Sequence, residues 1–355
     1  MPAMQFQHAA AALVDMPAAL VVPIVAFVVT LAFLWFLLSR FGRRVMLDRP
    51  NERSLHESPV PRSGGLAIAA GVAAGVAANA ATGVAIAPFV IAVTLGVAGV
   101  LALVSLADDA FTLPTPLRLL AHLGASGLVL AIGFGITEPA PFVLLLLAIA
   151  WYANLYNFMD GSDGLAGGMA VFGFGAYAWA AQQSGLGALA GLGASVAVSS
   201  FAFLLVNFHP ARLFMGDVGS VPLGFLAGAL GVLGWRDGAW PLWFPLLVFA
   251  PFVCDASLTL VKRMLRRERV WQAHREHYYQ RLVRMGFGHR GVARIEYAVM
   301  AGCAATALLV RTAEPEMQAA AIGAATAFLL AIAVWVDVRW AQWSRSSRDS
   351  GGMAA

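Results

Sequence analysis

The amino-acid sequence predicts an all-α polytopic membrane protein, and its composition, hydropathy and repeated apolar runs all lead to this fold class. The chain has 355 residues, of which 60% are hydrophobic and only 12% are charged, with a mean hydropathy of +0.76. Soluble proteins contain about 25% charged residues, so this composition argues against a soluble fold. Apolar runs of about 20 residues, enough to cross a bilayer, recur along the chain. They are too continuous for the alternating strands of a β-barrel, so we expect helical spans.

Eleven spans are expected, with ten as the alternative, because several runs are short or rich in glycine. In chain order they are 18–39, 64–82, 86–107, 117–135, 141–157, 166–183, 187–206, 219–235, 241–262, 293–311 and 317–338. The first run has no basic residue before Arg40, so we interpret it as a retained span and not as a signal peptide. A single transmembrane catalytic domain, 1–338, and a short, disordered cytoplasmic tail, 339–355, are predicted.

Basic residues predict the orientation of these spans. If the N-terminus lies outside, 21 of the 23 Lys and Arg residues fall in or beside the inner segments, and only Arg236 and Arg311 lie on the other side. This is the positive-inside pattern, so we expect the inner segments to be cytoplasmic. Those segments are 40–63, 108–116, 158–165, 207–218, 263–292 and the chain after 338. The same pattern explains the net charge of +4 without a nucleic-acid partner.

The first polar motif is the pair Asp108 and Asp109, which closes the third span in SLADDAFTLP. Two carboxylates at the negative end of a helix dipole cost stability unless a cation offsets them. A metal or a basic partner is therefore implied, and a solvated pair at the membrane exit is the structural alternative.

The second motif, NLYNFMDGSDGLAGG, follows the fifth span. Its polar residues recur every three positions as Asn154, Asn157, Asp160 and Asp163, so a helix that continues through the first three would hold them near one face. Such groups are costly at membrane depth and usually line a polar cavity. Gly161 and Gly164 would then break the helix and let the backbone approach a ligand. Capping of a helix end is the structural alternative.

The third motif, NFHPARLFMGDVGSVPLGF, places Asp217 just before a span. The structural alternative, which its position fits well, makes Asp217 the N-cap of that helix. Capping does not exclude metal binding, and carboxylate and amide oxygens suit Mg²⁺ or Mn²⁺ better than softer metals.

The fourth motif, WQAHREHYYQRL, contains His274 and His277, which would share one face of a helix with Arg275 and Arg281. A face so rich in donors suits a phosphate or diphosphate. Asp255 lies within the ninth span, and two interpretations stay open: an intramembrane functional carboxylate, or a structural ion pair with a nearby basic residue of the same helix end.

Together, in this order and topology, these motifs resemble the polyprenyl-phosphate N-acetylhexosamine-1-phosphate transferases, glycosyltransferase family 4, over residues 40–292. The PRSGG turn, with Arg62, is similar to the first cytoplasmic signature of that family, and the two histidines to its last.

The resemblance implies a role for each matched residue. Asp217, with Asn157, would hold Mg²⁺, with Mn²⁺ as the alternative. Phe214 and the Asp163–Gly164 turn would contact uridine. The remaining matches are Asp108, Asp109, Asp160, His274 and His277 as catalytic residues, and Arg62, Arg118 and Asn154 as substrate-binding residues.

The implied reaction transfers a HexNAc-1-phosphate from a UDP-sugar to undecaprenyl phosphate and releases UMP, at the bacterial inner membrane. Asp108 is expected to be a base or an organiser of the lipid phosphate, and direct attack and a phosphoryl-aspartate route both stay open. The sequence around His274 differs from the triple-His run of the peptidoglycan translocase. This difference favours the O-antigen or common-antigen branch. The sugar (GlcNAc, FucNAc or QuiNAc) and a homodimeric state stay open. Peptidoglycan lipid I synthesis is the alternative within the family, and a transporter or lipid flippase is the alternative from another class.

Overall fold

The structure is a computed structural model that describes residues 18–39, 47–48, 60–81, 89–135, 138–270, 272 and 274–351. The N-terminal elements are α2 (Ala18–Leu38), β1 (Leu47–Asp48), β2 (Val60–Pro61), α3 (Gly64–Ala81), α4 (Phe89–Phe111), α5 (Thr115–Leu128) and η2 (Val129–Gly133). The central elements are α6 (Pro139–Met159), α7 (Leu165–Gln183), α8 (Gly187–Asn207), α9 (Asp217–Arg236), α10 (Phe244–Val248) and α11 (Ala250–Leu265). The C-terminal elements are α12 (Tyr278–Leu282), η3 (Val283–Phe287), α13 (Gly288–Val310) and α14 (Pro315–Gly351).

The all-α polytopic fold is confirmed. Within the described ranges, nine helices are long and apolar enough to cross a membrane, and each of the eleven expected spans has a helical counterpart. Two of the eleven expected spans are not among these nine helices. One is α7, a full-length helix rich in glycine and alanine, and the other is the run 241–262, which is broken into α10 and α11. The break lies at Phe249, two residues before Pro251, because proline has no N–H to donate and its ring crowds the preceding turn.

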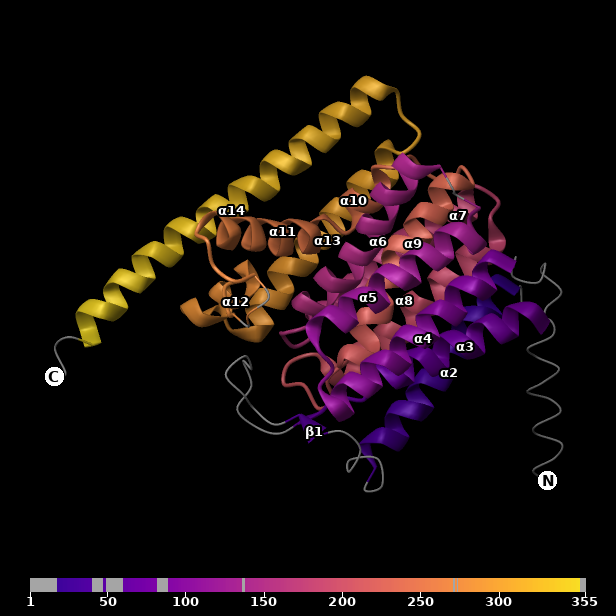
Figure 1. Cartoon of the computed structure of the whole chain (residues 1–355), viewed down its shortest axis with the longest axis horizontal. Coiled ribbons are helices and arrows are strands. Elements are labelled where there is room, and N and C mark those ends of the chain that lie inside the picture. The colour runs from indigo at the N-terminus through magenta and orange to yellow at the C-terminus, as the bar shows by residue number, and fades with distance from the viewer. Residues whose placement is uncertain are drawn as a thin grey trace.

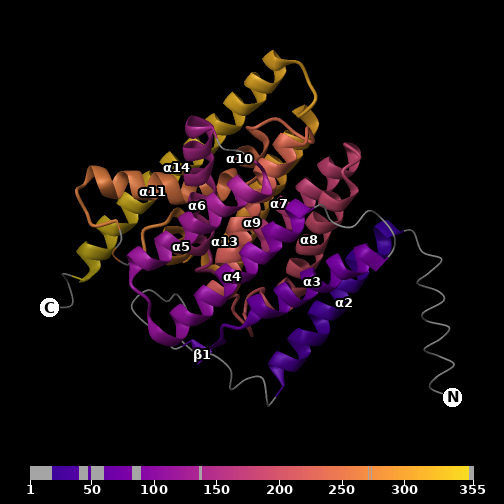
Figure 2. The same cartoon turned by 45° about the vertical axis from the view of Figure 1, so that its right-hand side comes forward.

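Helix α9 lies at the centre of the bundle, packed on α6, α4 and α3, and its apolar window is 89% buried (Figures 1 and 2). Glycines allow this packing: a Cβ at Gly224 would overlap the α6 backbone at Tyr152, and one at Gly228 would lie 3.0 Å from the Cα of Ile149. Small residues are the usual means of close helix approach in lipid. The polar N-terminus of α9 is thereby held against the end of α6.

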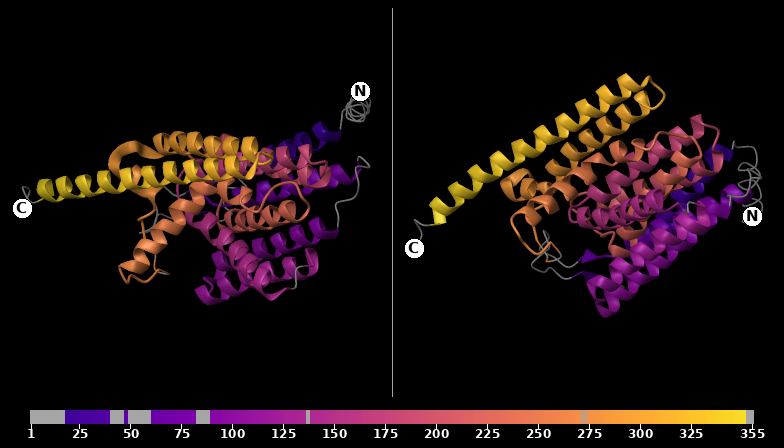
Figure 3. Two further views of the ribbon diagram at one scale, coloured as in Figure 1. Left: turned by 90° about the horizontal axis from the view of Figure 1, so that it is seen from above. Right: turned by 45° about the horizontal axis from the view of Figure 1, so that its top comes forward.

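The last helix differs from its prediction. Residues from 339 to Gly351 continue α14 as a helix instead of forming a disordered tail, and α14 extends past the rest of the bundle (Figure 3). Trp340 and Trp343 stack on each other, and Arg284 lies over the Trp340 ring, so this stretch has partners that its polar composition did not suggest. Most of the first expected polar loop, 40–59, lies outside the described residues.

Candidate active site

Two segments far apart in the chain are joined by backbone hydrogen bonds at one end of the bundle, near β1 in Figure 1. The Phe214 N–H donates to the Pro61 carbonyl at 2.7 Å, and the Gly64 N–H donates back to the Phe214 carbonyl at 2.9 Å. A Cβ at Gly65 would overlap the backbone of Gly219, so glycine is required for this approach. The PRSGG turn and the FMGD segment therefore form one unit, which we call the 60–65/214–219 junction.

Each of the paired aspartates has an arginine partner. Arg118 Nη1 lies 2.9 Å from Asp108 Oδ2, and Arg62 Nη1 lies 3.2 Å from Asp109 Oδ1. The Leu113 N–H also donates to Asp108 Oδ1 at 2.7 Å. The basic partner implied by the sequence is thus present for both carboxylates, and Arg62 brings the end of α4 to the 60–65/214–219 junction.

The Asn/Asp motif divides between two neighbouring helices. Helix α6 ends at Met159, one residue earlier than the pattern predicted, and Asp160 is its C-cap. Asn157 Nδ2 donates to Ser220 Oγ of α9 at 3.1 Å. Asn154 instead lies toward α5, where its Nδ2 is 3.0 Å from His122 Nδ1. The two asparagines therefore do not share one polar face.

His122, Asn207 and His209 were not identified from the sequence. His122 lies four residues after Arg118, on the same side of α5, and a histidine in an apolar helix could have pointed to it. Asn207 Oδ1 accepts the Gly164 N–H at 2.9 Å, and the Asn207 amide donates to the chain of the FMGD loop. Gly164 has a φ of +77°, so the glycine-based helix break is confirmed.

The Asp163 carboxylate anchors the loop before α9. Its Oδ2 lies 2.6 Å from His209 Nδ1 and accepts the Ala211 N–H at 3.1 Å, and the side chain is only 9% exposed. This carboxylate thus holds residues 209–211 in place beside the Gly164 turn. The expected contact of this turn and of Phe214 with uridine stays a prediction.

Asp160 and Asp217 bring two carboxylates near each other at this end of the bundle. Burial raises the pKa of Asp160 well above its usual range, and the nearby charge of Asp217 raises it further. Asp217 is the first residue of α9, whereas Gly216, with a φ of +73°, is the N-cap, so the N-cap prediction is wrong by one residue. The positive φ favours glycine at that position.

These oxygens suit a hard divalent cation. Among the residues that the structure describes, no three His, Cys, Asp or Glu side chains gather into a metal-binding group. A Mg²⁺ site, however, usually takes one or two carboxylates and completes its shell with waters and substrate phosphates. Asp160 and Asp217 repel each other, and a cation between them would remove that cost, so the donor set fits the expected ion.

The His motif contacts the end of α6, although its two histidines precede α12 and are not helical. The His274 and His277 rings lie 4.8 Å apart, and the His277 ring stacks on Phe158. The Tyr279 hydroxyl donates to the Phe158 carbonyl at 3.1 Å. The predicted pairing of the two histidines on one face of a helix is therefore replaced by a turn that brings His277 against the Asn/Asp motif and His274 against His277.

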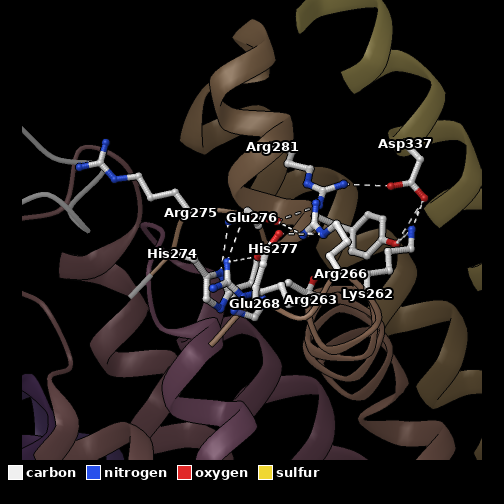
Figure 4. Close-up of polar contacts among 12 residues, drawn as sticks. Lys262, Arg263, Arg266, Glu268, His274, Arg275, Glu276, His277, Arg281 and Asp337 are labelled. Atoms are coloured by element: carbon white, nitrogen blue, oxygen red, sulfur yellow. Dashed lines mark hydrogen bonds and ion pairs between the residues drawn. The ribbon is translucent and has the colours of Figure 1, made fainter. Parts of the chain in front are cut away.

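Asp255 orients this turn. Its Oδ1 lies 3.0 Å from His277 Nδ1 and accepts the Tyr278 N–H at 3.0 Å, and its Oδ2 accepts the Tyr279 N–H at 3.0 Å. The ion pair with a basic residue of its own helix is therefore wrong: Lys262 pairs with Asp337, and Arg263 pairs with acidic residues of the following loop (Figure 4). Asp255 fixes which side of the His277 ring faces the site.

The expected basic face of this motif is also divided. Arg281 is buried and bonded to Asp337 of α14 at 2.9 Å, whereas Arg275 points away from that cluster (Figure 4). Neither lies with the histidines as a shared phosphate-binding surface, because the segment is not a continuous helix.

His274 should make the protein less stable in mild acid. Burial lowers the pKa of His274 to about 4, from the usual 6.5, and the charges of His277 and Arg263 contribute. Between these pH values the unfolded chain binds more protons than the folded chain, so stability falls as the pH drops from 6.5 toward 4. In detergent, the fall in unfolding temperature from pH 7 to pH 5 should be smaller for His274→Gln than for the wild type. Equal falls would contradict this reading of His274.

The comparisons with known proteins agree with this geometry. Residues 90–234 match the profile of Glycosyl transferase family 4. A Bacillus subtilis protein named probable undecaprenyl-phosphate N-acetylglucosaminyl 1-phosphate transferase is 27% identical over 78% of this chain and 81% of its own length. The decaprenyl-phosphate N-acetylglucosaminephosphotransferase of Mycobacterium tuberculosis is 29% identical over 70% and 71%.

A shorter stretch is similar to a second kind of relative. The phospho-N-acetylmuramoyl-pentapeptide-transferase of a Geobacillus species is 37% identical over 32% of this chain and 33% of its own length. The motifs, the polytopic helical fold and these matches together support one family for this chain: glycosyl transferase family 4, the polyprenyl-phosphate N-acetylhexosamine-1-phosphate transferases.

Proposed function

We propose that this protein transfers N-acetylglucosamine-1-phosphate from UDP-N-acetylglucosamine to undecaprenyl phosphate, with release of UMP. The observation that carries the proposal is the convergence of four sequence motifs at one end of the bundle. Arg62 bonds to Asp109, the PRSGG turn bonds to the FMGD segment, and Tyr279 bonds to Phe158. The names of the relatives with the longest matches support this acceptor class and this sugar.

The main obstacle to this reaction is charge repulsion. The second pKa of a phosphate monoester is near 6, so the attacking lipid phosphate is largely ionised at neutral pH and meets a diphosphate that is also anionic. Arg62, Arg118 and the His277 imidazole are the fixed groups that would hold these anions in line. Asp108 already pairs with Arg118, which favours a role for Asp108 in organising the lipid phosphate over a role as the base.

We further propose that Asp217, Asn157 and the adjacent Asp160 hold Mg²⁺, with Mn²⁺ as a substitute. When bound, the ion would offset the negative charge that develops between the two phosphates. The Asn157 side chain of α6 bonds to Ser220 of α9, so the Asn157 amide lies near the N-terminal end of α9, where Asp217 is located.

The orientation follows from the basic residues. The segments that carry the motifs hold most of the Lys and Arg of the chain, so this end is proposed to face the cytoplasm, where UDP-sugars are available. Initiation of O-antigen or a related surface polysaccharide is the proposed pathway step. A transporter would need its polar groups near the bilayer midplane, whereas these motifs lie at helix ends.

The purified protein should release UMP when it is given undecaprenyl phosphate, Mg²⁺ and UDP-N-acetylglucosamine. UMP and the lipid-linked product are measured together for a panel of UDP-HexNAc donors, because the sugar sets which branch of the family the protein serves. A chelator should stop the reaction, and omission of the lipid should do the same. If no donor gives UMP above the metal-free control, the proposed function is wrong.

A further inference from the structure

The last helix carries a carboxylate that joins it to the His motif. Asp337 of α14 lies 2.9 Å from Arg281 Nη1, and its other oxygen pairs with Lys262 of α11. The Tyr278 hydroxyl accepts from Lys262 at 2.6 Å and lies 3.5 Å from the same carboxylate. Figure 4 shows Asp337 on the α14 ribbon, directed toward these groups. Three elements, α11, α12 and α14, thus meet at one acidic side chain.

Asp337 and its partners Lys262, Arg281 and Tyr278 form a closely packed contact between three helices, which we call the Asp337 joint. Arg281 is only 7% exposed, and its guanidinium lies over the Tyr278 ring at 5.3 Å and the Trp340 ring at 5.9 Å. Val336, next to Asp337, is fully buried. A buried guanidinium needs a counter-charge, and Asp337 is its nearest carboxylate partner, since the Glu276 oxygen lies 3.8 Å away.

This joint is connected to the site through a very short helix. Helix α12 has five residues and begins with Tyr278 and Tyr279, whose N–H groups both bond to Asp255. His277, directly before α12, bonds to the same Asp255 oxygen as Tyr278. Helix α12 runs on into η3, where Gly286 has a φ of +97° and breaks the regular helix, so the N-terminal turn of α12 is held by Asp255 at one side and by the Asp337 joint at the other.

We propose that Asp337 is a positioning residue that holds α12 in place through Lys262, Arg281 and Tyr278, and thereby sets the position of His277 in the site. Asp337 lies outside the 90–234 segment matched by the family profile. The inference rests on the proposed function for its catalytic consequence, while the placement of His277 can be measured without turnover.

The test compares Asp337→Asn with Glu316→Gln, which removes the same charge from an exposed position at the other end of α14. Asp337→Asn should lower kcat for UMP release by about ten- to a hundredfold, because an ångström-scale displacement of a reacting group has effects of this size, with a much smaller change in KM for the UDP-sugar. Asp337→Glu should restore most of the rate. Glu316→Gln should behave as the wild type.

The second readout is the reaction of His277 with diethyl pyrocarbonate, followed by peptide mass spectrometry. The His277 side chain is only 4% exposed, so it should be labelled slowly in the wild type and in Glu316→Gln, and several times faster in Asp337→Asn. If Asp337→Asn does not fold, Tyr278→Phe, which removes only the hydroxyl, should give a smaller change in the same direction in both readouts.

Equal His277 labelling and equal kcat in Asp337→Asn, Tyr278→Phe and Glu316→Gln would overturn the inference. A fall in kcat without faster labelling would also overturn it, because the effect would then not act through His277. If the wild type releases no UMP, the proposed function fails, and the labelling of His277 alone decides whether Asp337 sets its position.

Discussion

Asp217→Asn is expected to lower UMP release by about a thousandfold or more while the protein stays folded. A bound metal ion contributes several kcal/mol to stabilising transition-state charge, and each 1.4 kcal/mol is tenfold in rate. Loss of one of the two proposed carboxylate ligands should remove most of that contribution. The measurement is UMP release at saturating Mg²⁺. Substantial residual activity would remove Asp217 from the metal-binding role.

The same variant has an opposite expected effect on stability. The charge of Asp217 contributes to the raised pKa of Asp160, so removal of that charge should raise the unfolding temperature measured in a chelator. The matched control is Asp237→Asn at the other end of α9, where the aspartate pairs with exposed Arg236. That variant should keep normal activity. A drop in unfolding temperature for Asp217→Asn would indicate that lost folding explains its inactivity.

Gly65→Ala is expected to lower both the stability and the activity of the protein. The added Cβ would overlap the Gly219 backbone at the start of α9, and backbone cannot move aside as a flexible side chain can. Overpacking of this kind costs about 1–3 kcal/mol. Both the unfolding temperature and the UMP release rate should fall, because the 60–65/214–219 junction places Arg62 and Asp217.

Gly99→Ala is the control for this change. Gly99 lies on α4, is exposed and has no atom within 4 Å of an added Cβ. Alanine is a better helix former than glycine, so the unfolding temperature should stay level or rise. Equal losses in the two variants would show that the close approach at Gly65 is not the cause.

The transmembrane helices were predictable because a bilayer demands long apolar runs with every backbone group bonded internally. The division of 241–262 at Phe249 was not foreseen, although Pro251 is a local signal for it. The helical continuation of α14 was missed for another reason. Its partners, Arg281 and Arg284, lie more than fifty residues earlier in the chain, so local composition could not show them.

The sequence predicted which polar segments form the site, but it did not predict which side chains bond to each other within it. The topology predicted from the basic residues placed the motifs at one membrane face, and the structure brings them to one end of the bundle. Which arginine forms an ion pair with which aspartate depends on how α3, α4 and α5 pack. The partner of Asp255 proved to be His277 across a turn, in place of the basic residues nearest in sequence, because tertiary contacts prevailed over sequence proximity.

The 60–65/214–219 junction also has a consequence for how the protein is made. The turn that carries Arg62 is synthesised about 150 residues before the FMGD loop that completes it. Chains fold from the N-terminus as they are synthesised. Helices α2 to α8 therefore enter the membrane before the FMGD segment, to which this turn bonds, has been made. Insertion of α9 between α6, α4 and α3 is then the event that closes the turn. A chain halted before the FMGD loop would therefore contain the PRSGG turn without the 60–65/214–219 junction.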